Sequence, residues 1–94
     1  MSIERADVVR SLAGRDQGQC FYVLEVQGEY LLLADGKGRR VEAPKRKKCK
    51  HVQRLPAAET GLTGKIREGM KITNSELRKA ILAISDQGNQ DQEG

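Results

Sequence analysis

The chain has 94 residues, of which 32% are charged, and a net charge of +4. This length predicts one domain with a modest core and little room for a deep catalytic cleft. No apolar run approaches the ~20 residues of a transmembrane helix, and the first nine residues lack the apolar segment of a signal peptide. We therefore expect a cytoplasmic protein without a membrane partner.

The positive charge is concentrated in one region. From Lys37 to Arg54 there are nine Lys or Arg and one Glu, a net charge of +8, whereas the rest has eight Lys or Arg and twelve Asp or Glu, a net charge of −4. A localised positive field attracts polyanions, of which nucleic acid is the commonest. An anionic membrane surface is disfavoured, because basic membrane-binding segments usually form amphipathic helices and this one carries turn and strand signals.

Five short segments have the composition of β-strands. They cover residues 7–12, 20–26, 30–34, 39–43 and 49–55. The Gly-rich loop AGRDQGQ separates the first two, and tight turns at Gly28 and at DGKG, residues 35–38, separate the next ones. Pro44 ends the fourth. This pattern predicts a mainly β fold, a small five-stranded antiparallel barrel.

Two of the predicted strands carry apolar residues on both faces. Phe21, Val23, Leu31 and Leu33 form one set, and the opposite set includes Tyr22. A small barrel buries only its inner face, so the outer set needs a cover. The sequence leaves open which set points inward.

The C-terminal part offers that cover. Residues 57–72 contain three glycines and are expected to be an extended connector. Residues 73–85 are expected to form a helix with the apolar stripe Leu77, Ile81 and Ile84. So short a helix needs a partner, and we expect it to fold back onto the barrel; the rival is a free helix that docks on another protein.

The ends of this helix have recognisable signals. Thr73 or Ser75 can cap its first turn, and Glu76 follows Thr73 at the spacing of a capping box. The tail 86–94 has no apolar residue and is expected to be disordered. The predicted organisation is a barrel over 1–56, a connector over 57–72, a helix over 73–85 and a disordered tail over 86–94.

The stretch from Val8 to Leu55 resembles a KOW domain, the small SH3-like barrel of several ribosomal proteins and of the NusG transcription factors. The loop AGRDQGQ, the turn ADGKGRR and the basic run before KHVQ carry the resemblance. The stretch is similar to archaeal and eukaryotic large-subunit ribosomal proteins, and most similar to small bacterial KOW-domain RNA-binding proteins. The resemblance implies an SH3-like barrel that binds structured RNA, with rRNA as the expected target, in ribosome assembly or translation.

The candidate RNA-binding residues follow the cationic segments. They are Gly14, Arg15, Lys37, Arg39, Arg40, Lys45, Arg46, Lys47, Lys48 and Lys50. Gly14 permits a sharp turn close to a phosphate, the arginines can form bidentate forks or stack on unpaired bases, and the lysines act as point charges. Because the few aromatic residues are expected in the core, backbone contacts to structured RNA are favoured over base stacking.

Catalysis and cofactors are not expected. His51 and Cys49 lie two residues apart, but no third group is apparent to orient them. Two Cys and one His do not supply the four ligands of a zinc site, and the thiols are expected to be reduced. The alternative to a non-enzymatic RNA-binding protein is a protein-interaction module of a transcription or ribosome-associated complex.

Overall fold

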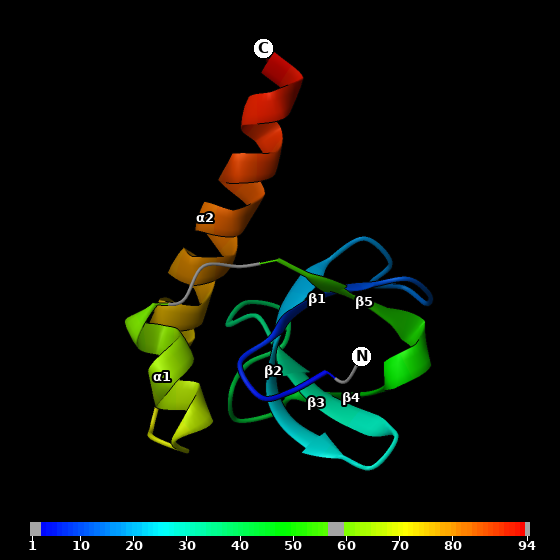
Figure 1. The fold of residues 1–94 in the computed structure, drawn as a ribbon, viewed down its shortest axis with the longest axis vertical. Helices are drawn as coiled ribbons and strands as arrows, with labels where there is room; N and C mark the ends of the chain where they lie inside the picture. Colours follow the sequence, from blue (N-terminus) through cyan, green and yellow to red (C-terminus); the bar gives the residue numbers. More distant parts are fainter. Residues whose placement is uncertain (1–2, 57–59, 94) are drawn as a thin grey trace.

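The structure, a computed structural model, describes residues 3–56 and 60–93, with side chains up to residue 84. The described chain is mainly β: a five-stranded antiparallel sheet and two α-helices (Figure 1). The strands are β1 Val8–Ser11, β2 Cys20–Gln27, β3 Tyr30–Ala34, β4 Lys45–Lys48 and β5 Val52–Leu55. The helices are α1 Gly61–Arg67 and α2 Asn74–Glu93.

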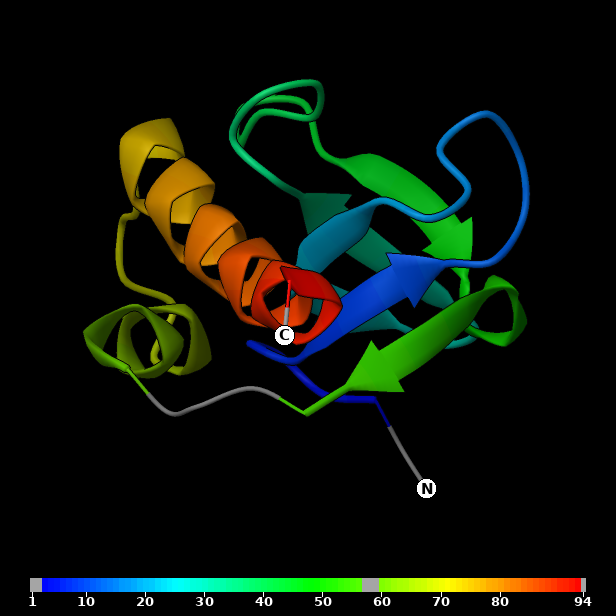
Figure 2. The ribbon, with the colours of Figure 1, turned by 90° about the horizontal axis from the view of Figure 1, so that it is seen from above.

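The sheet is curled, and both helices lie on one side of it (Figure 2). Its strand order is β4-β3-β2-β1-β5, which makes β4 and β5 the edges. A single 3-10 turn, η1 (Cys49–His51), connects these two edge strands. The sheet pairing does not join β4 to β5, so the hydrogen-bonded sheet is open rather than a closed barrel. A register shift between Val23 and Glu25 in β2 marks a bulge, a feature that increases the bending of a strand.

The first three strands match their predicted segments, whereas the fourth does not. The predicted strand over 39–43 is wrong, because these residues form turns in which Ala43 N–H donates to the Arg40 carbonyl at 3.0 Å. The fourth strand is the basic run Lys45–Lys48 itself, which pairs with β3. The fifth begins only at Val52, because η1 occupies the preceding residues.

The predicted extended connector is also wrong, because α1 forms within it. Thr60 and Thr63 form a reciprocal cap: the Thr60 hydroxyl accepts the Thr63 N–H at 3.3 Å, and the Thr63 hydroxyl accepts the Thr60 N–H at 3.1 Å. This arrangement satisfies N–H groups that the first helical turn leaves unpaired. Leu62 and Ile66 of α1 are buried. The rest of the predicted connector, residues 57–59, lies outside the described residues.

Thr73, rather than Ser75, caps α2. Its hydroxyl accepts the Glu76 N–H at 3.1 Å, and the Glu76 carboxylate accepts the Thr73 N–H at 2.9 Å, as in a capping box. The helix continues to Glu93, across a segment for which the sequence predicts disorder. A nucleated helix can extend through polar residues, since each added residue gains one backbone hydrogen bond.

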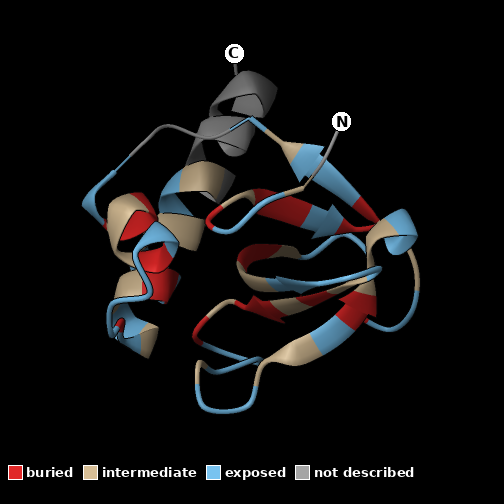
Figure 3. Cartoon of the chain, turned by 60° about the horizontal axis from the view of Figure 1, so that its bottom comes forward, coloured by how far each residue is buried: buried red, intermediate tan, exposed pale blue. Residues whose placement is uncertain are grey.

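The apolar core has two parts, one on each face of the sheet. Buried residues occur both in the strands and in the helices beside them (Figure 3). The inner cluster lies inside the curl and consists of Val9, Phe21, Val23, Leu31, Leu33 and Val52. The outer cluster lies under the helices and consists of Ala6, Val8, Tyr22, Ala34, Leu62, Ile66, Ile72 and Leu77. Ile81 and Ile84 pack against the outer cluster. The Phe21 set therefore points inward, and the stripe of α2 covers the opposite set.

The start of α2 also holds the turn region 35–43. Asn74 accepts the Val41 N–H at 2.8 Å and donates to Glu42 at 3.0 Å, and Arg78 donates to the Gly36 carbonyl at 2.7 Å. Gly36 has a φ of 79°, and a Cβ atom there would overlap with the Asn74 carbonyl oxygen. Only glycine fits this contact without a shift of the backbone.

We therefore expect Gly36→Ala to lower the free energy of unfolding by about 1–3 kcal/mol from the strained φ alone. The measurement is urea denaturation of the full chain. Gly38→Ala is the matched control, because an added Cβ meets no atom within 4 Å and no positive φ is found there; its effect should stay within about 0.5 kcal/mol. Equal midpoints for the two variants would contradict the tight contact between turn and helix.

Candidate nucleic-acid interface

Strand β4 divides the basic run between two faces of the sheet. Lys47 pairs with Leu31 and Lys45 with Leu33, both of which belong to the inner cluster. Because successive side chains of a strand point to opposite faces, Lys45 and Lys47 point inward, whereas Arg46 and Lys48 point outward. The basic run is thus not one continuous cationic surface.

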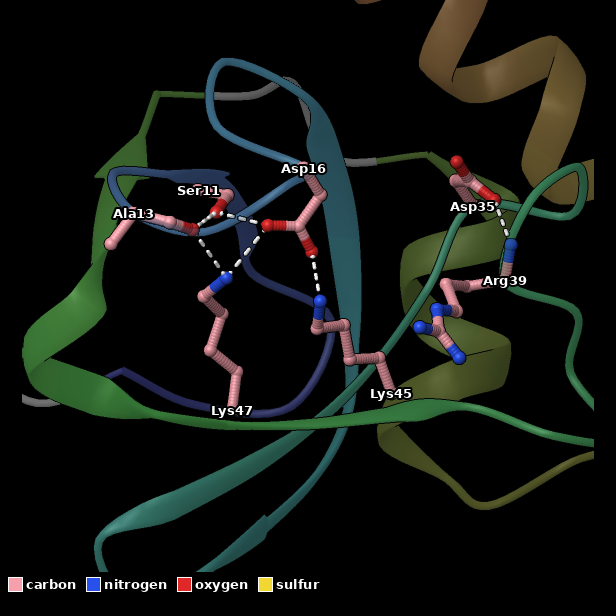
Figure 4. A network of polar contacts seen from close by, with 7 residues as sticks. All are labelled: Ser11, Ala13, Asp16, Asp35, Arg39, Lys45 and Lys47. Carbon is pink, nitrogen blue, oxygen red and sulfur yellow. Dashed lines mark hydrogen bonds and ion pairs between the residues drawn. The ribbon is translucent and has the colours of Figure 1, made fainter.

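The two inward lysines converge on Asp16 (Figure 4). Lys47 Nζ donates to Asp16 Oδ1 at 2.7 Å and to the Ala13 carbonyl at 2.8 Å, and its side chain is only 8% exposed. Lys45 Nζ lies 2.6 Å from Asp16 Oδ2. The Ser11 hydroxyl donates to Asp16 Oδ1 at 2.7 Å. We call Ser11, Asp16, Lys45 and Lys47 the Asp16 network; it ties the β1–β2 loop to the edge strand β4.

The surroundings of Asp16 keep it ionised. Burial acts to raise the pKa of the Asp16 carboxyl, but the hydrogen bonds from the two lysines and from Ser11 outweigh it, together with the charge of Lys47. The pKa therefore lies well below its ordinary value of 3.8. A nearly buried Lys47 then has a permanent counterion, which a buried charge requires.

The β1–β2 loop is shaped to bring Asp16 inward. Gly14 and Gly18 have φ values of 87° and 90°, a conformation that glycine adopts at little cost. The Gly18 N–H donates to the Ser11 carbonyl at 2.8 Å, and the Ser11 N–H donates to the Gln19 carbonyl at 2.9 Å, so the loop closes at its base. Arg15 is exposed on this loop, next to the inward Asp16.

The β3–β4 turn presents a second arginine. Asp35 Oδ1 accepts the N–H groups of Lys37 and Arg39, both at 2.9 Å, and the Arg39 carbonyl accepts the Asp35 and Gly36 N–H groups at 2.9 Å. An aspartate that bonds the backbone two residues on is a common way to fix a turn. The Arg39 side chain is exposed and extends from this fixed backbone (Figure 4).

Three cations from separate segments line one surface hollow. Arg15 comes from the β1–β2 loop, Arg39 from the β3–β4 turn and Lys45 from β4, with Gln19 and Gly38 between them. Asp16 and Phe21 also line the hollow. In the described part of the chain, neither arginine forms a salt bridge. We call this site, defined by Arg15, Arg39 and Lys45, the cationic hollow.

The other predicted binding residues lie outside this hollow. Lys37 and Arg40 are exposed in the 35–43 region, and Lys37 borders a neighbouring hollow beside Ile81 of α2. Lys50 lines a different hollow with Gly28 of the β2–β3 hairpin. Lys47 is buried in the Asp16 network, and Gly14 packs behind it: an added Cβ would lie 3.6 Å from Lys47 Nζ. Lys48 and Arg46 lie on the outer face of β4.

Asp16 is the residue of the candidate site that could not be predicted from the sequence. Its acidic side chain stands alone among basic and polar neighbours in the Gly-rich loop, and that isolation is the only signal the sequence gives. Gln19, which lines the cationic hollow, carries no signal of its own.

Cys49 and His51 lie in the 3-10 turn η1 rather than in a strand. In the described residues, no three His, Cys, Asp or Glu side chains gather in a group that could hold a metal ion. None of the helices described has the length and apolar character needed to cross a lipid bilayer.

Comparison with known proteins does not assign the chain to a family. No family model matches it, and no curated protein is similar to it at a significant level.

Because of the Asp16 network, we expect Asp16→Asn to lower the free energy of unfolding strongly. This variant leaves Lys47 buried without a counterion, and breaking a buried pair costs about 3–5 kcal/mol. Urea denaturation at neutral pH measures the loss. Glu25→Gln is the control, because it removes an exposed ion pair with Arg5 of similar length, 3.0 Å, and should leave the midpoint nearly unchanged. Similar midpoints for both variants would show that the network does not stabilise the fold.

The same network predicts a pH dependence. Because the pKa of Asp16 is lower in the folded than in the unfolded chain, its stabilisation is complete above 3.8 and is lost as the pH falls below that value toward the folded-state pKa. The difference in unfolding free energy between the native chain and Asp16→Asn should therefore shrink from about pH 5 to about pH 2. A difference that stays constant over this range would contradict the lowered pKa.

Proposed function

We propose that the protein binds RNA without catalysing a reaction, through the cationic hollow and the exposed cations around it. The observation that carries this proposal is the convergence of Arg15, Arg39 and Lys45 from three separate segments on one hollow. Like charges repel one another, so their gathering at a site without enough acidic partners favours an anionic ligand. A phosphate group matches such a site, because guanidinium forks and ammonium groups both bind phosphate oxygens.

Lys45 can serve both the fold and the ligand. Its ammonium group has three N–H donors, and the Asp16 carboxylate lies at one side of it, 2.6 Å away. The remaining donors are available to a phosphate at the hollow, which Lys45 lines. The Asp16 network thus positions Lys45 before the ligand arrives, which lowers the ordering cost of binding.

We further propose that the curled sheet is an SH3-like barrel of the KOW type, acting in the cytoplasm in ribosome assembly or translation. The strand order β4-β3-β2-β1-β5 and the 3-10 turn between β4 and β5 are compatible with such a barrel. The motifs that resemble KOW domains supply two walls of the hollow: the loop AGRDQGQ contributes Arg15, and the turn ADGKGRR contributes Arg39.

The ligand that fits best is structured RNA, and rRNA is the target we propose. Exposed cations extend beyond the hollow to Lys37 and Arg40, so several phosphates of a folded backbone can be contacted at once. Phe21 and Tyr22 are buried and cannot act as stacking platforms. Recognition at the hollow therefore rests on the shape and charge of the backbone.

A protein-interaction module is the second candidate, favoured by one observation. Leu82 of α2 is 63% exposed and lines a hollow with Ile81 and the turn residues Asp35 and Lys37. An apolar patch rimmed by charged residues is a common feature of protein-binding surfaces, and Ile81 with Leu82 forms a small one beside Asp35 and Lys37. A partner from a transcription or ribosome-associated complex would be held there without RNA.

The test is RNA binding at several salt concentrations. If about four to six phosphates are contacted, log affinity falls with log salt at a slope of about −3 to −5. The double variant Arg15→Glu with Arg39→Glu should weaken binding to many structured RNAs alike and make the salt slope shallower. Lys47 is left unchanged, because it is buried and its reversal would disrupt the Asp16 network.

The control is Lys71→Glu, which reverses an exposed cation between the two helices. Its RNA affinity should stay within about twofold of that of the native chain when both are measured at a salt concentration that screens long-range charge effects. Unchanged affinity in the double variant, with the melting temperature retained, would rule out the cationic hollow as the site. A partner that stays bound after nuclease treatment and is lost in Leu82→Glu would instead support the protein-interaction module.

A further inference from the structure

The outer face of β3 and β4 carries an aromatic–cation cluster separate from the cationic hollow. The guanidinium carbon of Arg46 lies 3.9 Å from the centre of the Tyr30 ring, and Lys48 Nζ lies 5.7 Å from the same centre. Tyr30 is paired across the sheet with Lys48, and Arg46 is paired with Leu32. Arg46 therefore reaches diagonally along the outer face to cover the ring.

The short distance fixes how Arg46 sits. An atom 3.9 Å from a ring centre must lie over the face of the ring, because the ring's own edge atoms would hold it farther away in the plane. The contact is thus a cation–π stack. Arg46 is exposed, and in the part of the chain that the structure describes no carboxylate pairs with it. A guanidinium that lies flat on the Tyr30 ring from this position leaves its other face open to solvent, because Arg46 is exposed.

We propose that the Tyr30–Arg46 stack binds one unpaired nucleobase, which lies on the open face of the Arg46 guanidinium, while Lys48 contacts the adjoining phosphate. This inference rests on the proposed RNA binding and adds a base-contacting surface to it. Arginine planes are stacking partners for unpaired bases, and the ring beneath holds the guanidinium in place before binding. The sequence alone favoured backbone contacts over base stacking.

The chemistry of the stack favours a base over an acidic peptide. A carboxylate binds the N–H edge of a guanidinium through two parallel hydrogen bonds and does not stack on its flat face. A nucleobase uses that face, and the two cations beside it attract the phosphate that every nucleotide carries. The aromatic ring below extends the stack by one layer, so a base would complete a Tyr–Arg–base arrangement.

The position of β4 lets one RNA reach both sites. β4 is an edge strand, and its neighbouring residues Lys45 and Arg46 point to opposite faces of the sheet. Lys45 belongs to the cationic hollow, and Arg46 belongs to the stack. An RNA that passes over this edge can place phosphates at the hollow and one flipped-out base on the outer face. The target is thus a structured RNA with an unpaired base next to a helix.

The experiment compares two RNAs that differ in one nucleotide: a hairpin with a single bulged adenosine in its stem, and the same hairpin without the bulge. We expect the native chain to bind the bulged RNA about tenfold more tightly, the gain of one modest stacking contact. Arg46→Lys keeps the charge but removes the plane. It should bring the affinity ratio of the two RNAs close to one and leave binding of the fully paired hairpin within about twofold.

Arg10→Lys is the matched control, since it makes the same change at an exposed strand arginine outside the proposed RNA-binding residues; its ratio should remain that of the native chain. A second readout is NMR: the Arg46 side-chain protons should shift upfield with the bulged RNA alone, because the base adds a ring current. An equal ratio in native chain and Arg46→Lys, or a native ratio of one, would overturn the inference while RNA binding stands. Failure of the native chain to bind either RNA would overturn both proposals.

Discussion

The structure depends on the ion network around Asp16. This carboxylate lies between Lys45 and Lys47 and links the β1–β2 loop to the edge strand β4, two segments that the sheet does not pair. Burying charges has a desolvation cost that the pairing only partly offsets. Removing Asp16 would still be costly, because Lys47 would stay buried without a counterion. A shift of β4 by one residue would turn Arg46 and Lys48 inward in place of Lys45 and Lys47, and Arg46 would lose its contact with the Tyr30 ring.

In this register the cations of β4 have different roles. Lys47 serves only the fold, because its side chain is nearly buried. Lys45 keeps Asp16 on one side and borders the cationic hollow on the other. Arg46 lies on the outer face and is ordered by Tyr30 rather than by an acid. The basic run of β4 looks uniform in sequence, but it supplies a structural ion pair, a cation that lines the hollow and a stacked guanidinium. The roles differ because successive side chains of the strand point to opposite faces of the sheet.

The parts of the fold that were predictable from sequence are those with local signals. β2 and β3 have the β-branched, aromatic and leucine-rich composition of strands. The capping-box spacing of Thr73 and Glu76 indicates the start of α2. β4 was missed because KRKK has no apolar residue. It forms a strand in which Lys45 and Lys47 pair with residues of the inner cluster and their charges are balanced by Asp16. α1 was missed because glycine disfavours helices, and its burial in the outer cluster is a long-range property. The candidate cations were all visible in the sequence, but their grouping required the pairing of β3 with β4.

The helix α2 takes part in presenting the cations as well as covering the sheet. Its first residues bond the Val41 N–H and the Glu42 carboxylate, and Arg78 bonds the Gly36 carbonyl. These contacts hold the turn region from which Arg39 extends. A helix that left the sheet to dock on another protein would expose Leu77, which is completely buried, and would release the turn. Partner binding through α2 is therefore compatible with this fold only at its outward face, where Leu82 lies, and such a partner would sit next to the turn that presents Arg39 rather than replace the contact between helix and sheet.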